Sequence, residues 1–155
     1  MFFCRTTCLK LGKAFSIGRM NKGYTIFLLL LLLAYLGKSA SFDYIKFNIP
    51  HNFPEKVWRD ALAKAFDGQV EVNILGGRID VETESEVFEL DFIHKWHEGL
   101  GQALHYADVT GMEGVLALIS QQPLEKLFPK DLAQLDLIIC ICARHDIQVI
   151  VLFPL

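Results

Sequence analysis

Two short, largely apolar segments in the C-terminal half of the chain constrain its fold more than any other feature. Residues 114–119 and 147–153 are short runs of mainly aliphatic side chains, the pattern of strands that are covered on both faces. A helix expected at 131–144 separates them, and Pro123 and Pro129 punctuate the connection. Parallel strands need a crossover of this kind, so this half of the chain predicts a parallel β-α-β unit in a layered α/β domain.

The part of the chain before these strands indicates a helix, three strands and a second helix. The expected elements are an extended lead-in at 42–51, a helix opened by Pro54 and stopped by Gly68, strands at 69–75, 78–82 and 86–93, a hairpin turn at Gly76 and Gly77, a second turn at 83–85, and a helix at 95–109. The order after the lead-in is αβββαβαβ, with an antiparallel meander first and parallel crossovers later. We therefore expect an α/β fold with a mixed sheet flanked by helices.

Residues 1–41 have the composition of a targeting segment. They contain six basic and no acidic residues, and their apolar run at 26–36 is too short to cross a bilayer, which takes about 20 residues. Small residues at Ser39 and Ser41 favour signal cleavage after Ser41, and a start at Met20 would give a compact bacterial-style signal. We expect export, to the periplasm or beyond, with an uncleaved membrane anchor through 26–36 as the alternative.

The charge balance of the remaining domain, residues 42–155, is strongly acidic. It holds nine basic and eighteen acidic residues, a formal charge of −9. Attraction between Lys or Arg and phosphates supplies most non-specific affinity for nucleic acid. This balance counts against a processive or tight DNA binder, and leaves DNA or RNA only as a weakly held partner.

Three acidic residues are expected to meet on two neighbouring strands. Alternation along the strand at 86–93 turns Glu89 and Asp91 to one face, opposite the core-forming Phe and Leu side chains. Asp80 lies on the preceding strand, across a short turn. Carboxylates that converge in this way can hold Mg²⁺ or Mn²⁺ against a phosphate, so all three are candidate metal ligands. The alternatives are a solvated strand-end acid for Asp80 and an exposed face of an edge strand for Glu89 and Asp91.

The helix that follows carries three polar residues on one stripe. Lys95, Glu98 and Gln102 stand at i, i+3 and i+7, apart from the apolar side of the helix, and the stripe is expected to look back over the carboxylates. These three residues are the candidate catalytic side chains. For Lys95 a structural ion pair with Asp91 or Glu98 is the alternative.

The segment that carries these residues resembles a known superfamily. It reads R-I-D at 78–80 and then E-L-D-F-I-H-K-W-H-E-G-L-G-Q-A-L-H-Y-A at 89–107. This resembles the PD-(D/E)xK nuclease-like superfamily, and most closely small exported bacterial proteins of unassigned function with the pattern R-[IV]-D, then E-V-D-F-A-x-K-W-x-E-A-[IV]-G-Q-[AS]-L-x-Y-A. The resemblance covers most of residues 54–153. It implies a restriction-endonuclease-like core in which Asp80 and Glu89 hold the metal and Gln102 braces the site.

The chain departs from the superfamily at the lysine. The superfamily's lysine stands two residues after the second acid, and that position here is Asp91. Lys95 is the nearest replacement, because its long stem can bring an ammonium group to the same point from the adjoining helix. The first hypothesis is therefore a Mg²⁺- or Mn²⁺-dependent phosphodiesterase of nuclease type that acts outside the cytoplasm. The alternative is a non-catalytic periplasmic binding or interaction module that retains a nuclease-like fold.

Overall fold

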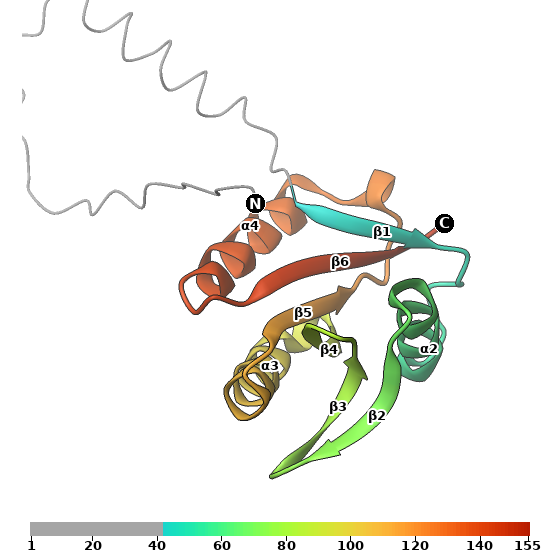
Figure 1. The fold of residues 1–155 in the computed structure, drawn as a ribbon. Coiled ribbons are helices and arrows are strands. Elements are labelled where there is room, and N and C mark those ends of the chain that lie inside the picture. Colours follow the sequence, from blue (N-terminus) through green and yellow to red (C-terminus); the bar gives the residue numbers. More distant parts are fainter. Residues whose placement is uncertain (1–41) are drawn as a thin grey trace, which may run out of the picture. The chain divides into compact units, whose positions relative to one another are not determined.

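Six strands form one sheet in the computed structural model, which describes residues 42–155 (Figure 1). The strands are β1 (Asp43–Phe47), β2 (Gln69–Ile74), β3 (Gly77–Glu82), β4 (Glu86–Phe92), β5 (Glu113–Ile119) and β6 (Gln148–Pro154), in the spatial order β1-β6-β5-β4-β3-β2. The meander β2-β3-β4 is antiparallel, and β4, β5, β6 and β1 pair in parallel. The expected α/β class with a mixed sheet is confirmed.

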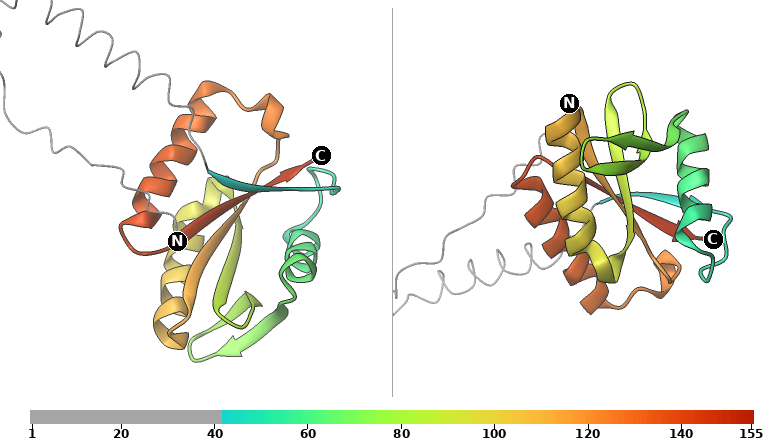
Figure 2. Two further views of the ribbon diagram at one scale, coloured as in Figure 1. Left: turned by 45° about the horizontal axis from the view of Figure 1, so that its top comes forward. Right: turned by 90° about the horizontal axis from the view of Figure 1, so that it is seen from below.

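Helices cover both faces of this sheet (Figures 1 and 2). They are α2 (Glu55–Phe66), α3 (Trp96–Thr110) and α4 (Pro129–Ala143), with 3₁₀ turns at Ile93–Lys95 and Leu124–Lys126. Pro54 precedes α2, and Asp67 ends it in a left-handed conformation with φ of 53°. Gly111, with φ of 71°, ends α3 in the same way, as glycine does at many helix ends. None of the helices in the described part of the chain is both long and apolar enough to cross a membrane.

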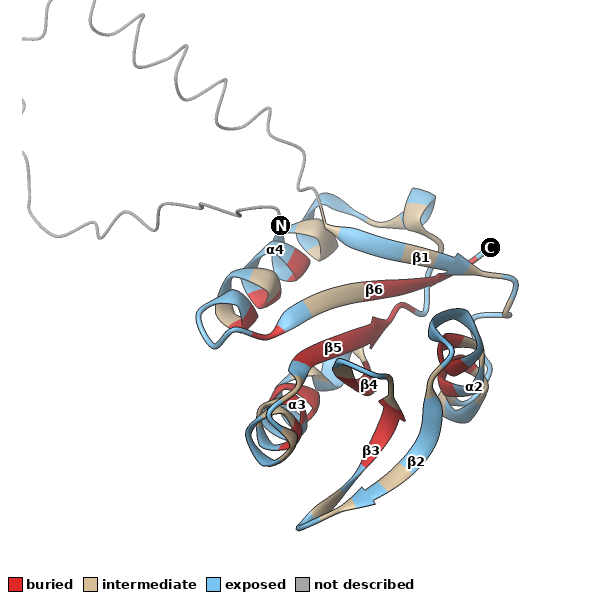
Figure 3. Cartoon of the chain, viewed as in Figure 1, coloured by how far each residue is buried: buried red, intermediate tan, exposed pale blue. Residues whose placement is uncertain are grey.

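The central strands are buried on both faces (Figure 3). On one face α2 packs Trp58 and Leu62 against Phe88 and Leu90 of β4. On the other face α3 and α4 pack over β5 and β6. The buried members of this second core are Leu100, Ala103, Leu116, Leu118, Leu135, Ile138, Cys142, Ile147, Val151 and Phe153. Any polar side chain on β3 or β4 is therefore held inside the protein and needs a partner or a ligand.

Two local predictions differ from the structure. The lead-in is in part a true strand, because β1 pairs in parallel with β6, which lies about a hundred residues further along the chain. The hairpin turn is formed by Leu75 and Gly76, one residue earlier than expected, because Gly77 pairs with Ile74. Gly76 supplies the positive φ of 83° that this turn needs. The predicted targeting segment lies outside the described residues.

Candidate functional site

An open cleft of about 640 Å³ lies between α3 and the meander. All six residues that the sequence predicts as metal ligands or catalytic side chains line it. The lining residues include Asp80, Glu89, Asp91, Lys95, Glu98 and Gln102. The structure therefore brings together side chains from β3, β4, α3 and the 3₁₀ turn that precedes α3. The three acids are buried at the floor, Lys95 is exposed on the turn, and Glu98 and Gln102 are exposed along α3.

Glu89 and Asp91 form the floor of the cleft. Each is only 5% exposed, and their strand, β4, lies between β3 and β5 inside the sheet. The alternative of an exposed edge-strand face is therefore wrong. The approach of α3 is close, because a Cβ atom on Gly99 would stand 3.1 Å from the Cβ atom of Asp91. Only a glycine at this position of α3 lets the helix lie so close over the floor.

Asp80 interrupts the pairing between β3 and β4. The regular pairing between these strands joins Val81 with Phe88 and Glu82 with Val87. Beyond these pairs, the backbone N–H of Leu90 donates to Oδ2 of Asp80 at 2.9 Å. Asp80 is 9% exposed. Its side chain is buried between two strands, so the alternative of a solvated strand-end acid is wrong.

The carboxyl groups on the floor of the cleft are too close together and too buried to be ionised all at once. Burial raises the pKa of Glu89 to about 9. The charge of Asp80, a hydrogen bond to Asp80 and the charge of Asp91 act in the same direction. Glu89 is therefore protonated at neutral pH and shares a hydrogen bond with Asp80. Burial also raises the pKa values of Asp80 and Asp91. A cation in the cleft would relieve this repulsion, so the electrostatics favour a site that exchanges a proton for a metal ion.

Lys95 supplies positive charge at the rim of the cleft. It ends the 3₁₀ turn before α3, its side chain is exposed, and its charge lowers the pKa of Asp91 against the effect of burial. It forms no ion pair with another residue of the described chain. The structural ion pair with Asp91 or Glu98 is thus not formed, and the ammonium group is available to a ligand.

Gln102 is held in place by a buried tyrosine. The hydroxyl group of Tyr106, one turn further along α3, donates to Oε1 of Gln102 at 3.1 Å. Tyr106 is itself 4% exposed and packs against Ile79 and Val87. Because Oε1 is engaged, the amide NH₂ of Gln102 is the group left to face a ligand in the cleft.

Glu55 belongs to this site, although the sequence analysis did not predict it. It lies in the first turn of α2, is half-buried, and lines the same cleft. Burial raises its pKa, and the charges of Asp80 and Asp91 add to the effect. An acid in the first turn of a helix is common for helix-dipole reasons alone, so its sequence position carried no signal.

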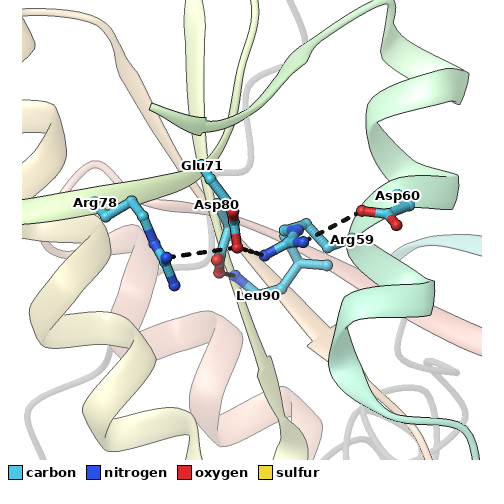
Figure 4. A network of polar contacts seen from close by, with 6 residues as sticks. All are labelled: Arg59, Asp60, Glu71, Arg78, Asp80 and Leu90. Carbon is cyan, nitrogen blue, oxygen red and sulfur yellow. Dashed lines mark hydrogen bonds and ion pairs between the residues drawn. The ribbon is translucent and has the colours of Figure 1, made fainter. Parts of the chain in front are cut away.

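A buried arginine, Arg59, lies beside Asp80 (Figure 4). Arg59 of α2 is 7% exposed and binds Oε1 of Glu71 at 2.6 Å, and Arg78 approaches the same oxygen at 3.5 Å. In the register of β2 and β3, Glu71 lies opposite Asp80, and its φ of 57° departs from strand geometry. The Arg59 charge opposes the effect of burial on the pKa of Asp80. Arg59 therefore favours the ionised form of Asp80, while Glu89 carries the proton.

The donors of the floor suit a hard divalent cation. They are carboxylate oxygens, the ligand type that Mg²⁺ and Mn²⁺ prefer. No three His, Cys, Asp or Glu side chains within residues 42–155 are spaced to close around one ion. Mg²⁺ usually keeps several waters and needs only one or two carboxylates, so the Asp80–Glu89 pair fits such an ion in both number and chemistry.

No protein-family model, curated protein or solved structure matches the chain. The features that define its class are therefore those of the fold and the cleft. It is an α/β protein whose sheet buries three carboxylates beneath an unpaired lysine at the rim of an open cleft.

Proposed function

We propose that the protein is a metal-dependent phosphodiesterase of nuclease type, and that the elements from α2 to β5 form a restriction-endonuclease-like core. The observation that carries this proposal is the buried Asp80–Glu89 pair, which faces Lys95 across one open cleft. The likeness of the segment at 78–107 to the PD-(D/E)xK pattern supports it. We further propose that residues 1–41 are a targeting segment and that the protein acts outside the cytoplasm.

Asp80 and Glu89 would hold Mg²⁺ or Mn²⁺, with Asp91 and Glu55 close enough to add negative charge. When bound, such an ion polarises the scissile phosphate and lowers the pKa of an attacking water. Glu89 must first release the proton that it shares with Asp80. Burial raises the pKa of Asp80 as well, but the hydrogen bond from the backbone N–H of Leu90 and the charge of Arg59 both favour its ionised form. The two carboxylates therefore play different parts in binding the ion.

The residues of α3 would act on the phosphate itself. Lys95 places an ammonium group on a flexible stem at the rim, where it can stabilise the negative charge that develops in the transition state. Gln102 presents its NH₂ group at a fixed point, because Tyr106 holds its oxygen. Glu98 is exposed on the same rim, beside Lys95 and Gln102.

The deciding test is metal-dependent cleavage by the purified protein. With Mg²⁺ or Mn²⁺ the wild type should cut DNA or RNA, and Glu89→Gln should lose cleavage while it stays folded by circular dichroism. The Gln side chain keeps the volume of Glu89 and its hydrogen bond to Asp80, so loss of cleavage would report on metal binding. A wild type that binds metal and cuts no single-stranded, double-stranded or branched substrate would leave the non-catalytic binding module as the function.

A further inference from the structure

Gly101 lies on the surface of α3 that lines the cleft, where nothing within residues 42–155 requires a glycine. A glycine inside a helix costs about 1 kcal/mol relative to alanine. A Cβ atom at Gly101 would meet no atom within 4 Å, and the φ angle here is an ordinary helical one. The chain therefore carries a destabilising residue at an exposed position of the cleft, without a packing reason for it.

Gly99, two residues earlier, provides the comparison. A Cβ atom there would stand 2.8 Å from Cδ1 of Leu116 and 3.1 Å from the Cβ atom of Asp91. Gly99 is thus explained by the close packing of α3 on β4 and β5. Nothing in residues 42–155 explains the space beside Gly101, whereas a ligand that comes close to the backbone of α3 would explain it.

The shape of the cleft limits what can lie there. The hairpin tip closes one end, because His105 Nε2 is hydrogen-bonded to the carbonyl oxygen of Leu75 at 3.0 Å. A Cβ atom on Gly77 would stand only 2.8 Å from Cε1 of Tyr106, so the hairpin lies directly against α3. The stretch of α3 from Lys95 to His105 is roughly 15 Å long at 1.5 Å per residue. The cleft is a short trough with one closed end.

The charges around the trough also limit the ligand. Of the cationic residues, only Arg78 and Lys95 line it, with His105 at the closed end. Arg59 is buried behind the floor and bound to Glu71. A protein that grips a duplex neutralises many phosphates with Lys and Arg, and a domain of charge −9 cannot provide such a surface. Two cations and a histidine match only a few phosphates.

We propose that the cleft takes the end of a single unpaired phosphodiester strand, a few nucleotides long, whose backbone passes directly over Gly101. This inference rests on the proposed function, because the phosphate that is cut would lie over Asp80 and Glu89. Lys95 then contacts the strand at the open end of the trough, and Arg78 and His105 contact its terminus at the closed end. Gly101 leaves room for the sugar-phosphate chain between these contacts.

The test uses single-stranded DNA and RNA tetranucleotides and a 20-base-pair duplex, each with a fluorescent label. Binding is measured by anisotropy in Ca²⁺, which takes the same oxygen ligands, and cleavage is measured separately in Mn²⁺. The wild type should bind a tetranucleotide at least 10-fold more tightly than the duplex. Gly101→Ala should raise the melting temperature, because it removes a helix-interior glycine, and yet weaken tetranucleotide binding about 10-fold. Gly101→Leu should abolish binding.

Gly99→Ala is the matched control, since it should lower the melting temperature by forcing α3 away from β4. Unchanged tetranucleotide binding in both Gly101 variants, or equal affinity for the duplex, would overturn the inference. Duplex cleavage that does not depend on Gly101 would overturn this inference about the ligand. The same result would support the proposed nuclease function. Tetranucleotide binding that depends on Gly101, without cleavage in Mn²⁺, would support the ligand class and overturn the catalytic function.

Discussion

Oδ2 of Asp80 accepts a hydrogen bond from the backbone N–H of Leu90 at 2.9 Å, so a side chain takes a place in the ladder between two antiparallel strands. This contact fixes the carboxylate of β3 beside Glu89 of β4. An Asn side chain at this position could still accept the bond through its amide oxygen, whereas Ala could not. Asp80→Asn is therefore the variant that removes the charge of Asp80 without opening the strands.

The first prediction concerns metal binding. Mn²⁺ at 100 times its dissociation constant should stabilise the folded protein by about 2.7 kcal/mol and raise its melting temperature by roughly 10 °C. Asp80→Asn and Glu89→Gln should each abolish this rise in thermal scans with and without metal. Asp108→Asn, an exposed acid of α3 outside the carboxylate floor, is the control and should keep it. A wild type with no shift at millimolar Mn²⁺ would refute the metal site.

The second prediction concerns stability and pH in the absence of metal. The pKa of Glu89 is about 9 in the folded protein and near 4.5 when the chain is unfolded, so between these values the folded state binds a proton that the unfolded state lacks. The free energy of unfolding should therefore fall as the pH rises from 4.5 to 9. The raised pKa values of Asp80, Asp91 and Glu55 act in the same direction.

Urea unfolding at pH 6 and pH 8.5 measures this effect. Glu89→Gln should remove most of the pH dependence and be more stable than the wild type at pH 8.5, because its amide cannot ionise. Glu84→Gln, at an exposed turn position, should follow the wild type at both values. Equal urea midpoints for the wild type at the two pH values would mean that Glu89 is not protonated in the fold.

The third prediction concerns the catalytic role of Lys95. Lys95→Ala should lower the cleavage rate by orders of magnitude and leave both Mn²⁺ affinity and melting temperature nearly unchanged, because this lysine makes no ion pair in the described chain. Lys64→Ala, an exposed lysine at the end of α2, is the matched control and should keep full activity. A Lys95→Ala protein that is less stable and fully active would show a structural role only.

The fourth prediction concerns Arg59 as a positioning residue. Arg59→Met keeps the bulk of the side chain but removes the charge that favours the ionised form of Asp80, so it should weaken Mn²⁺ binding measured by calorimetry. It should also lower the melting temperature, because the ion pair with Glu71 is lost. Glu71→Gln breaks the same pair and leaves the Arg59 charge in place. If both variants weaken Mn²⁺ binding equally, Arg59 acts only through the fold.

The fifth prediction concerns processing of the N-terminal segment. Expressed in a bacterium with its own N-terminus, the protein should accumulate outside the cytoplasm as a species that begins at or near Phe42. Mass spectrometry of a periplasmic extract measures this. An intact membrane-bound product would indicate the anchor through 26–36, and an intact cytoplasmic one would refute export.

The features that could be predicted from sequence depend on neighbouring residues. Alternation along β4 placed Glu89 and Asp91 on one face, because successive strand residues point to opposite sides whatever surrounds them. The spacing of Lys95, Glu98 and Gln102 placed them on one stripe of α3 for the same kind of reason.

The features that could not be predicted depend on contacts between distant segments. Glu55 and Arg59 enter the site only because α2 packs across the meander, and its own sequence does not specify that position. Glu71 has a left-handed backbone conformation and pairs with Arg59, and no local sequence pattern predicts either feature. Burial of β4 on both faces follows from its central place in the sheet, and that place is a property of the whole topology.

The pairing of β1 with β6 has a consequence for how the chain comes to be folded. Among the described strands β6 is the only neighbour of β1, so the register of β1 cannot form until β6, about a hundred residues further along the chain, has been made. At synthesis rates of about 5–20 residues per second, the intervening hundred residues take roughly 5–20 s to appear. Throughout that interval β1 has no partner strand in the described sheet, so the N-terminal edge of the sheet is completed last.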